Sequence, residues 1–187
     1  MKRPPEACAS WRGINAGHSA TVARARGQDG GVVSMDRFFS TFTHRLDSKG
    51  RVSIPAPFRA ALARDGGDTL HALPCLDAQA LDCGGNALLR EIDGLVGSFP
   101  PYSPERDALS TALLGTSEVL KMDSEGRVVL TESLKTWAGI ALEATFVGQG
   151  HKFQIWEPDR FRARLEEARL RARDLRAGTG RLAETGP

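Results

Sequence analysis

The sequence predicts an α+β fold built from two tandem copies of one unit, related by a pseudo-two-fold axis. A pattern at residues 46–59 recurs without gaps at residues 122–135. In each copy two runs of alternating apolar residues flank a cluster of turn residues, which is typical of a β-hairpin. Patterns typical of short helices follow each hairpin. A repeat this short indicates that the two copies pack against each other to bury an apolar surface.

Residues 1–34 are rich in Gly, Ala, Arg and Ser and show no apolar periodicity. We expect a disordered extension, or an over-extended start with Met35 as the initiator. A basic arm that touches phosphates is the functional alternative. Patterned sequence begins at Met35, and we assign residues 35–88 to the first domain.

The two copies match at a constant offset of 76 positions. Five pairs of positions are identical, namely Asp47 and Asp123, Ser48 and Ser124, Gly50 and Gly126, Arg51 and Arg127, and Val52 and Val128. An Asp side chain can bond the backbone amide two residues on, and Gly accepts a positive φ. We therefore expect Asp47, Gly50, Asp123 and Gly126 to fix two equivalent tight turns, each followed by an arginine.

In the first copy the pattern predicts strands at 42–46 and 51–54, a helix at 58–63, strands at 69–73 and 80–83, and a helix at 87–96. Val52 and Ile54 share one face of their strand. Pro57 suits the first turn of the first helix.

Between the copies, Ser103 and Pro104 begin a helix that ends at Gly115, inside a helical linker at residues 89–116. The second domain is assigned to residues 117–160, where Thr131 caps a helix that runs to Trp137. The remaining predictions are strands at 144–147 and 152–156, an amphipathic helix from 159 to about 176, and a disordered tail from Ala177 within a C-terminal segment 161–187.

Composition and charge exclude several classes of protein. Of the 187 residues 41% are hydrophobic and 26% charged, and no apolar run approaches the roughly 20 residues of a membrane helix. Three cysteines at irregular spacing indicate neither a disulfide framework nor a zinc site, so we expect a reducing cytoplasm. The net charge is only +2, so DNA binding would need local positive charge or oligomerisation. We expect no cofactor and no metal.

The repeat and two further runs resemble the MraZ family of bacterial transcriptional regulators. The matching residues are 46–55, 113–118, 122–127 and 147–156, and the likeness extends over about residues 35–170. The resemblance implies two tandem AbrB-like swapped-hairpin β-barrel repeats with short helices. It also implies a ring-shaped homo-oligomer that binds double-stranded DNA at short direct repeats upstream of its own division and cell-wall gene cluster.

The resemblance assigns DNA contact to the D-x-x-x-R loops, which run from Asp47 to Arg51 and from Asp123 to Arg127. A guanidinium group that projects from a hairpin can bind a phosphate, or the O6 and N7 atoms of guanine. We expect DNA contacts from the basic residues in and beside the loops, which are Arg51, Arg127, Lys49, Arg45 and Lys121. Glu125 and Leu120 replace Lys49 and His44 in the second copy, so the first loop should attract DNA more strongly.

Other interpretations stay open at this point. Each arginine could be a solvated turn residue paired with its Asp. Nothing places His44 or Cys75 in a catalytic arrangement, and no nucleotide or metal motif occurs, so we do not expect an enzyme. A structural or protein-binding ring and an antitoxin-like regulator of the same fold are the alternatives to a nucleoid-associated regulator. The seven arginines between 160 and 176 should form a solvated face, with a second DNA contact or an anionic membrane surface as alternatives.

Overall fold

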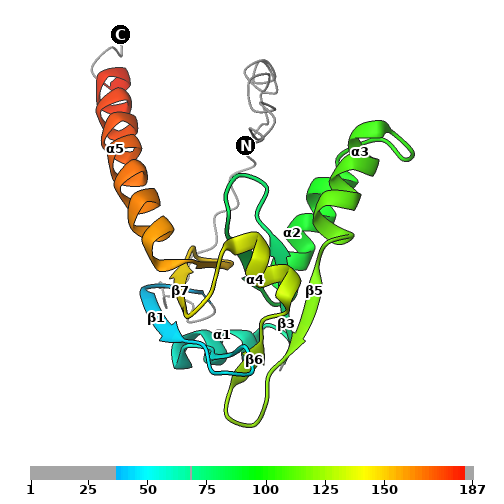
Figure 1. The fold of residues 1–187 in the computed structure, drawn as a ribbon. Coiled ribbons are helices and arrows are strands. Elements are labelled where there is room, and N and C mark those ends of the chain that lie inside the picture. The colour runs from blue at the N-terminus through cyan, green and yellow to red at the C-terminus, as the bar shows by residue number, and fades with distance from the viewer. Residues whose placement is uncertain (1–36, 68, 184–187) are drawn as a thin grey trace, which may run out of the picture. The chain divides into compact units, whose positions relative to one another are not determined.

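A computed structural model describes residues 37–67 and 69–183, so the expectations for residues 1–34 and for Met35 lie outside the described residues. Its elements are, in chain order, β1 (Thr41–Arg45), β2 (Arg51–Ser53), α1 (Ala56–Arg64), β3 (Thr69–Pro74), β4 (Leu81–Gly84), α2 (Asn86–Gly97), α3 (Pro104–Leu109), the π-helical turn η1 (Ser110–Leu114), β5 (Glu118–Lys121), β6 (Arg127–Val129), α4 (Glu132–Ala138), β7 (Glu143–Gly148), β8 (Phe153–Trp156) and α5 (Pro158–Ala183) (Figure 1). The predicted α+β class is confirmed, and all predicted bounds of individual helices and strands but one agree to within two residues.

The exception is the end of α5, which continues to Ala183 and so into the predicted tail. The predicted end at about Arg176 is therefore too early. The expectation of disorder rested on the Gly- and Thr-rich composition from Ala177 onward. Lengthening an existing helix adds one backbone hydrogen bond for each ordered residue, whereas starting a helix needs a costly nucleus, so isolated glycines need not stop it.

Strands from the two copies interleave in one six-stranded antiparallel sheet, in the order β1-β7-β8-β4-β3-β5. In the second copy β5, β7 and β8 take the places that β1, β3 and β4 have in the first. Exchanging the copies turns this order into its own reverse, as expected for a pseudo-two-fold arrangement centred between β4 and β8. The copies pair through β1 with β7, β3 with β5, and β4 with β8. Neither copy therefore forms the sheet alone.

β2 and β6 form a separate two-stranded antiparallel ribbon, the β2–β6 ribbon. Its central pair is Val52 and Val128, which are equivalent in the repeat. The Ile54 amide donates to the carbonyl of Gly126, and the Leu130 amide donates to the carbonyl of Gly50, both at 3.0 Å. Each loop is thus held by the chain segment that follows the strand of the other copy.

One apolar core is shared by both copies. Phe58 of α1 packs against Phe153 of β8 with ring centroids 4.9 Å apart, and both rings are fully buried. The inner face of the ribbon adds Val52 and Val128 to the same core. Because one copy of about 45 residues is near the lower limit for an independent core, this shared burial explains why the fold needs both.

The helix starts follow the capping chemistry expected from the sequence. The Ser103 hydroxyl accepts from the Arg106 amide at 3.2 Å, and the Thr131 hydroxyl accepts from the Leu134 amide at 3.3 Å. Each cap satisfies an amide that has no partner within its helix. Pro57 lies in the first turn of α1, as predicted.

α5 packs on the rest of the fold through its first turns. The apolar stripe of the predicted amphipathic helix consists of Phe161, Leu165, Ala168, Ala172 and Leu175. Phe161 and Leu165 are half-buried, and the Phe161 ring lies 6.3 Å from that of Trp156. Every side chain from residue 166 to residue 177 is exposed. The outer half of the stripe, including Ala168 and Ala172, is therefore exposed within a single chain.

Two further sequence expectations concern membranes and cysteines. Within residues 37–67 and 69–183, no helix is long and apolar enough to cross a membrane. Cys75 and Cys83 are buried free thiols, and burial raises the pKa of both. A raised pKa opposes formation of a thiolate, so these cysteines behave as small buried apolar residues.

Candidate nucleic-acid interface

Asp47 organises the loop between β1 and β2, which we call loop 1 (residues 47–51). Its Oδ1 accepts hydrogen bonds from the amides of Lys49 at 2.8 Å and Arg51 at 2.9 Å, and its Oδ2 accepts one from Arg51 Nε at 2.7 Å. The Asp47 carbonyl accepts from the Gly50 amide at 3.0 Å. One carboxylate therefore closes the turn and also sets the direction of the arginine side chain.

Asp123 makes the same contacts in loop 2 (residues 123–127), between β5 and β6. Its Oδ1 accepts from the amides of Glu125 and Arg127, and its Oδ2 accepts from Arg127 Nε, all at 2.9 Å. The Gly126 amide donates to the Asp123 carbonyl at 2.9 Å. The repeat in sequence is thus a repeat in hydrogen bonding.

These contacts stabilise the charged forms of the side chains. The pKa of Asp47 falls from 3.8 to about 2, chiefly because the Arg51 amide donates to its carboxylate. The Arg127 amide lowers the pKa of Asp123 in the same way. The side-chain hydrogen bond from Arg127 to Asp123 raises the pKa of Arg127 in turn. Carboxylates with lowered pKa values are poor proton donors and weak proton acceptors at neutral pH.

Glycine is required at both turns because φ is 71° at Gly50 and 74° at Gly126. The space around the two glycines differs. A Cβ atom on Gly126 would lie 2.3 Å from Cδ of Arg59, whereas one on Gly50 would lie 3.4 Å from Nζ of Lys135. Loop 2 is therefore the more tightly covered of the two.

Arg59 in α1 and Lys135 in α4 are equivalent residues, and each reaches the loop of the other copy. Arg59 Nη1 also donates to the Ile54 carbonyl at 2.6 Å, and Lys135 Nζ pairs with Glu132 at 2.6 Å. These two residues were not among the predicted site residues. Their matched basic character in the repeat was the available signal.

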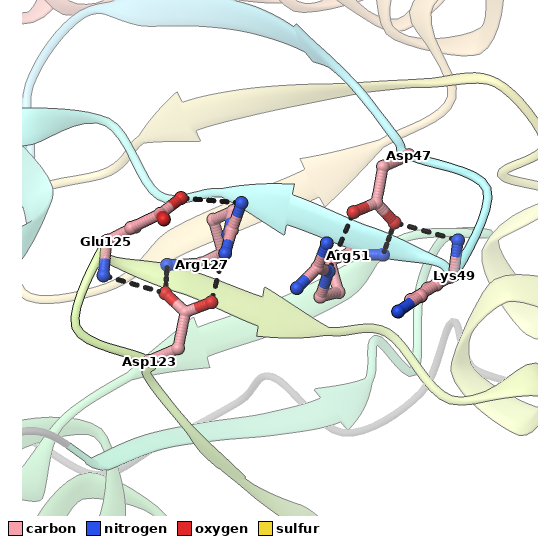
Figure 2. A network of polar contacts seen from close by, with 6 residues as sticks. All are labelled: Asp47, Lys49, Arg51, Asp123, Glu125 and Arg127. Carbon is pink, nitrogen blue, oxygen red and sulfur yellow. Dashed lines mark hydrogen bonds and ion pairs between the residues drawn. The ribbon is translucent and has the colours of Figure 1, made fainter.

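Both loop arginines lie on one face of the β2–β6 ribbon. Arg51 is opposite Val129, and Ser53 is opposite Arg127. Opposite residues, and residues two apart along a strand, project from the same face. These four residues therefore form one outer surface, which we call the ribbon face. Figure 2 shows the two loops at opposite ends of the ribbon, with each carboxylate turned onto its own arginine.

The two loops differ in how their arginines are occupied. Glu125 Oε2 lies 2.6 Å from Nη1 of Arg127, so in loop 2 an ion pair already occupies part of the Arg127 guanidinium group (Figure 2). Loop 1 has Lys49 at the matching position, and the terminal nitrogens of Arg51 have no hydrogen-bond or ion-pair partner within the described residues. Loop 1 carries a net charge of +1 and loop 2 a net charge of −1.

Arg45 and Lys121 lie at the ends of β1 and β5, two residues before the loop aspartates, and both are exposed. Arg45 is opposite Glu143 of β7, and Lys121 is opposite Thr69 of β3. Both belong to the six-stranded sheet rather than to the β2–β6 ribbon. They therefore flank the ribbon face without being part of it.

His44 takes a structural position in the first copy. Its Nδ1 donates to the Ser53 carbonyl at 2.6 Å, and its ring lies 5.6 Å from that of Phe146. The equivalent residue is Leu120, which is buried in the core. His44 therefore holds β2 through the Ser53 carbonyl and is not part of the loop cluster of basic residues.

Comparison with known proteins identifies the family and confirms the resemblance seen in the sequence. The family model described as "MraZ protein, putative antitoxin-like" matches residues 112–181. A protein of Beijerinckia indica named "Transcriptional regulator MraZ" is 72% identical over 142 residues, which cover 76% of this chain and 87% of that protein. A protein of the same name from Methylocella silvestris is 69% identical over 142 residues, with the same coverage of both chains. One from Parvibaculum lavamentivorans is 41% identical over 143 residues, or 76% of this chain and 89% of that protein. At this identity and coverage, the chain belongs to the MraZ family of transcriptional regulators.

Proposed function

We propose that this chain is a sequence-specific regulator that binds duplex DNA through the ribbon face and loops 1 and 2. One observation carries the proposal: two arginines, each held by an aspartate, project from the same face of a two-stranded ribbon. The major groove of B-DNA admits a two-stranded ribbon of this kind. A guanidinium group at its surface can bind guanine or a phosphate.

The aspartates support DNA binding by holding the arginines in place beforehand. Each carboxylate already fixes the Nε end of its arginine, so less side-chain freedom is lost when DNA binds. In loop 1 the terminal nitrogens of Arg51 have no partner among residues 37–67 and 69–183, and Lys49 adds positive charge. In loop 2 Glu125 competes with DNA for Arg127. Loop 1 should therefore provide more of the attraction to phosphates.

The basic residues around the ribbon face should act mainly through phosphates. Arg45 and Lys121 flank the ribbon, and Arg59 and Lys135 lie against the loops. Phosphate contacts position a protein on DNA without reading its sequence. Their loss should weaken binding to every duplex to a similar extent.

We further propose that the chain has the domain architecture implied by the family resemblance. Residues 35–88 and 117–160 would be two AbrB-like swapped-hairpin domains that close a β-barrel, joined by the helical linker at 89–116. The interleaved strand order supports it, as do the two hydrogen bonds, one at each loop, that join a loop to the other copy. Both features require the copies to fold together.

We also propose a ring-shaped homo-oligomer in the cytoplasm, associated with the nucleoid. It would act on short direct repeats in the promoter of its own division and cell-wall gene cluster. A nearly neutral chain offers few DNA contacts, and several linked copies raise the effective concentration of each loop at neighbouring boxes. The exposed outer half of α5, with Ala168, Leu170 and Ala172, offers apolar surface for contacts between copies. Light scattering tests this assembly, and a monomer at binding concentrations would contradict it.

The central test measures binding of the full chain to DNA from upstream of its own gene. Fluorescence anisotropy is recorded over a salt series, with scrambled DNA of the same composition as the control. We expect a preference for native DNA that is lost in the double variant Arg51→Ala/Arg127→Ala. Circular dichroism and light scattering check that the variant keeps its fold and assembly.

The alternatives make different predictions in the same experiment. Binding to phosphates weakens as salt rises, because displaced counterions favour the complex at low salt. Equal binding to native and scrambled DNA, or no binding to either, would favour a structural or protein-binding ring. The words "antitoxin-like" in the family description favour one further candidate, a regulator that also masks a toxin through its C-terminal segment. A toxin gene beside this one, with a product that binds the chain, would support that candidate.

A further inference from the structure

The ribbon face carries one apolar side chain among polar ones. Val129 is 51% exposed, whereas Val52 and Val128 beside it face the core and are almost completely buried. Single exposed apolar residues are common on protein surfaces. Val129 differs from them in its position, because it lies directly opposite Arg51 on the face proposed to meet DNA.

The ribbon face has two ends that match in geometry and differ in chemistry. Val129 and Ser53 are equivalent in the repeat, and each lies opposite the loop arginine of the other copy. One end is formed by Arg51 with Val129, and the other by Arg127 with Ser53. Opposite side chains have Cβ atoms about 5 Å apart, so each end covers about one or two base pairs.

The net charges of the loops also differ between the two ends of the ribbon face. Loop 1, with a net charge of +1, adjoins the end that holds Arg51 and Val129. Loop 2, with a net charge of −1, adjoins the end that holds Arg127 and Ser53. A pseudo-symmetric frame thus presents an apolar, cationic end and a polar, anionic end.

We propose that Val129 and Ser53 add to the sequence specificity provided by the loop arginines, with Val129 contacting the C5-methyl group of a pyrimidine in one half of the DNA box. This inference rests on the proposed function. The thymine methyl is the apolar feature of the major-groove base edges, and apolar side chains recognise it there. Ser53 makes a polar contact in the other half, because a hydroxyl group can pair with many base edges. The chain therefore binds its box in one orientation.

The test adds or removes one methyl group at a time. The shortest native duplex that binds is made with each thymine in turn replaced by deoxyuridine, and with each cytosine in turn replaced by 5-methylcytosine. Burying one methyl-sized group changes an affinity by about fourfold. We expect a change of about that size at one pyrimidine, in one half of the box only.

Variants of the ribbon face connect the effect to Val129. Val129→Ser should keep the preference for native over scrambled DNA and lose the methyl dependence. The exchange variant Ser53→Val/Val129→Ser should move the methyl dependence to the other half of the box. Val129→Thr is the matched control, because it keeps one methyl group and the β-branched shape. Thermal unfolding checks that each variant is folded.

The outcomes separate this inference from the proposed function. A chain that prefers native DNA but shows no methyl dependence overturns the inference and leaves the proposed function in place. A methyl dependence that persists unchanged in Val129→Ser has the same consequence. A chain without preference for native DNA overturns the proposed function, and the inference with it.

Discussion

Loops 1 and 2 have the same backbone and different surfaces. In both, an aspartate accepts from two loop amides and from the Nε of the arginine that follows the glycine. The glycine φ angles differ by only 3°. The side chain between the turn serine and the glycine differs, however. Among the described residues, nothing pairs with the terminal nitrogens of Arg51 beside Lys49, whereas Glu125 binds those of Arg127. The Asp-x-x-Gly-Arg frame therefore sets the shape, and one variable residue sets the charge.

Comparison of the two copies thus separates the residues needed to close the turn from the residue that sets the surface charge. Residues that close the turn are identical in the two copies, because any change at Asp47 or Gly50 alters the backbone. The side chain of Lys49 or Glu125 is free to vary, because only the backbone amide of that residue helps to close the turn. The two copies therefore share one backbone geometry and carry different surface charges.

The largest expected effect comes from removing one arginine at a time. Arg51→Ala should weaken binding to a single-box native duplex by about tenfold or more, in the range expected for a base- or phosphate-binding arginine. Arg127→Ala should weaken it by only about two- to threefold, because Glu125 already occupies part of its guanidinium group. Anisotropy titrations at one salt concentration measure both. Equal losses would show that the neighbouring charge does not matter.

The glycines should distinguish the loops in stability. Gly50→Ala should cost about 1–2 kcal/mol, because a residue with a Cβ is strained at this φ. Gly126→Ala should cost about 1 kcal/mol more, because the new Cβ displaces Arg59 from its hydrogen bond to the Ile54 carbonyl. Urea unfolding measures the difference. A Gly126→Ala variant no less stable than Gly50→Ala would mean that Arg59 moves aside freely.

A smaller change should make loop 2 resemble loop 1. Glu125→Lys frees the tip of Arg127 and raises the charge of the loop by two, so affinity at low salt should rise about three- to tenfold. The slope of log affinity against log salt concentration should become steeper, corresponding to about one or two additional released counterions. Glu125→Gln frees Arg127 without adding a cation and should give an intermediate result. The exposed Glu125–Arg127 pair adds little stability, so both variants should fold.

The smallest expected effect is a loss of stability at acidic pH, to which Asp47 and Asp123 both contribute. The pKa of Asp47 is lowered from 3.8 to about 2 in the folded chain, so its contribution to stability is present above about pH 4 and is lost as pH falls toward 2. The stability difference between the wild type and Asp47→Asn should therefore narrow over that range. Asp123→Asn should behave in the same direction. Denaturant unfolding at several pH values measures this, and a difference independent of pH would contradict the role of the carboxylate charge.

Much of the local structure could be predicted because its causes are local. The turn at Asp47 to Gly50, the cap at Thr131 and the alternation of Val52 and Ile54 depend on residues within a few positions of each other. The predicted end of α5 was wrong because it was judged from composition. Composition alone does not show that a helix already under way will continue through two glycines.

The site was predictable only in part. The sequence pointed to Arg51, Arg127 and Lys49 as neighbours of a turn, and the structure places all three there. Their role in DNA binding stays a prediction. Arg59 and Lys135 were missed, because the contact of each with the other copy's loop joins residues far apart in the chain.

The sequence by itself determined the duplication, the two aspartate-held turns, the order of helices and strands, and the unequal charges of the loops. Each of these follows from backbone preferences and side-chain chemistry over a few residues. Only the tertiary structure decided that Val52 pairs with Val128, that both arginines share one face, and that Glu125 binds the tip of Arg127. Strand partners and register across 76 positions are selected by the apolar surface that the two copies bury together. The total area of that buried surface cannot be read from any short stretch of sequence.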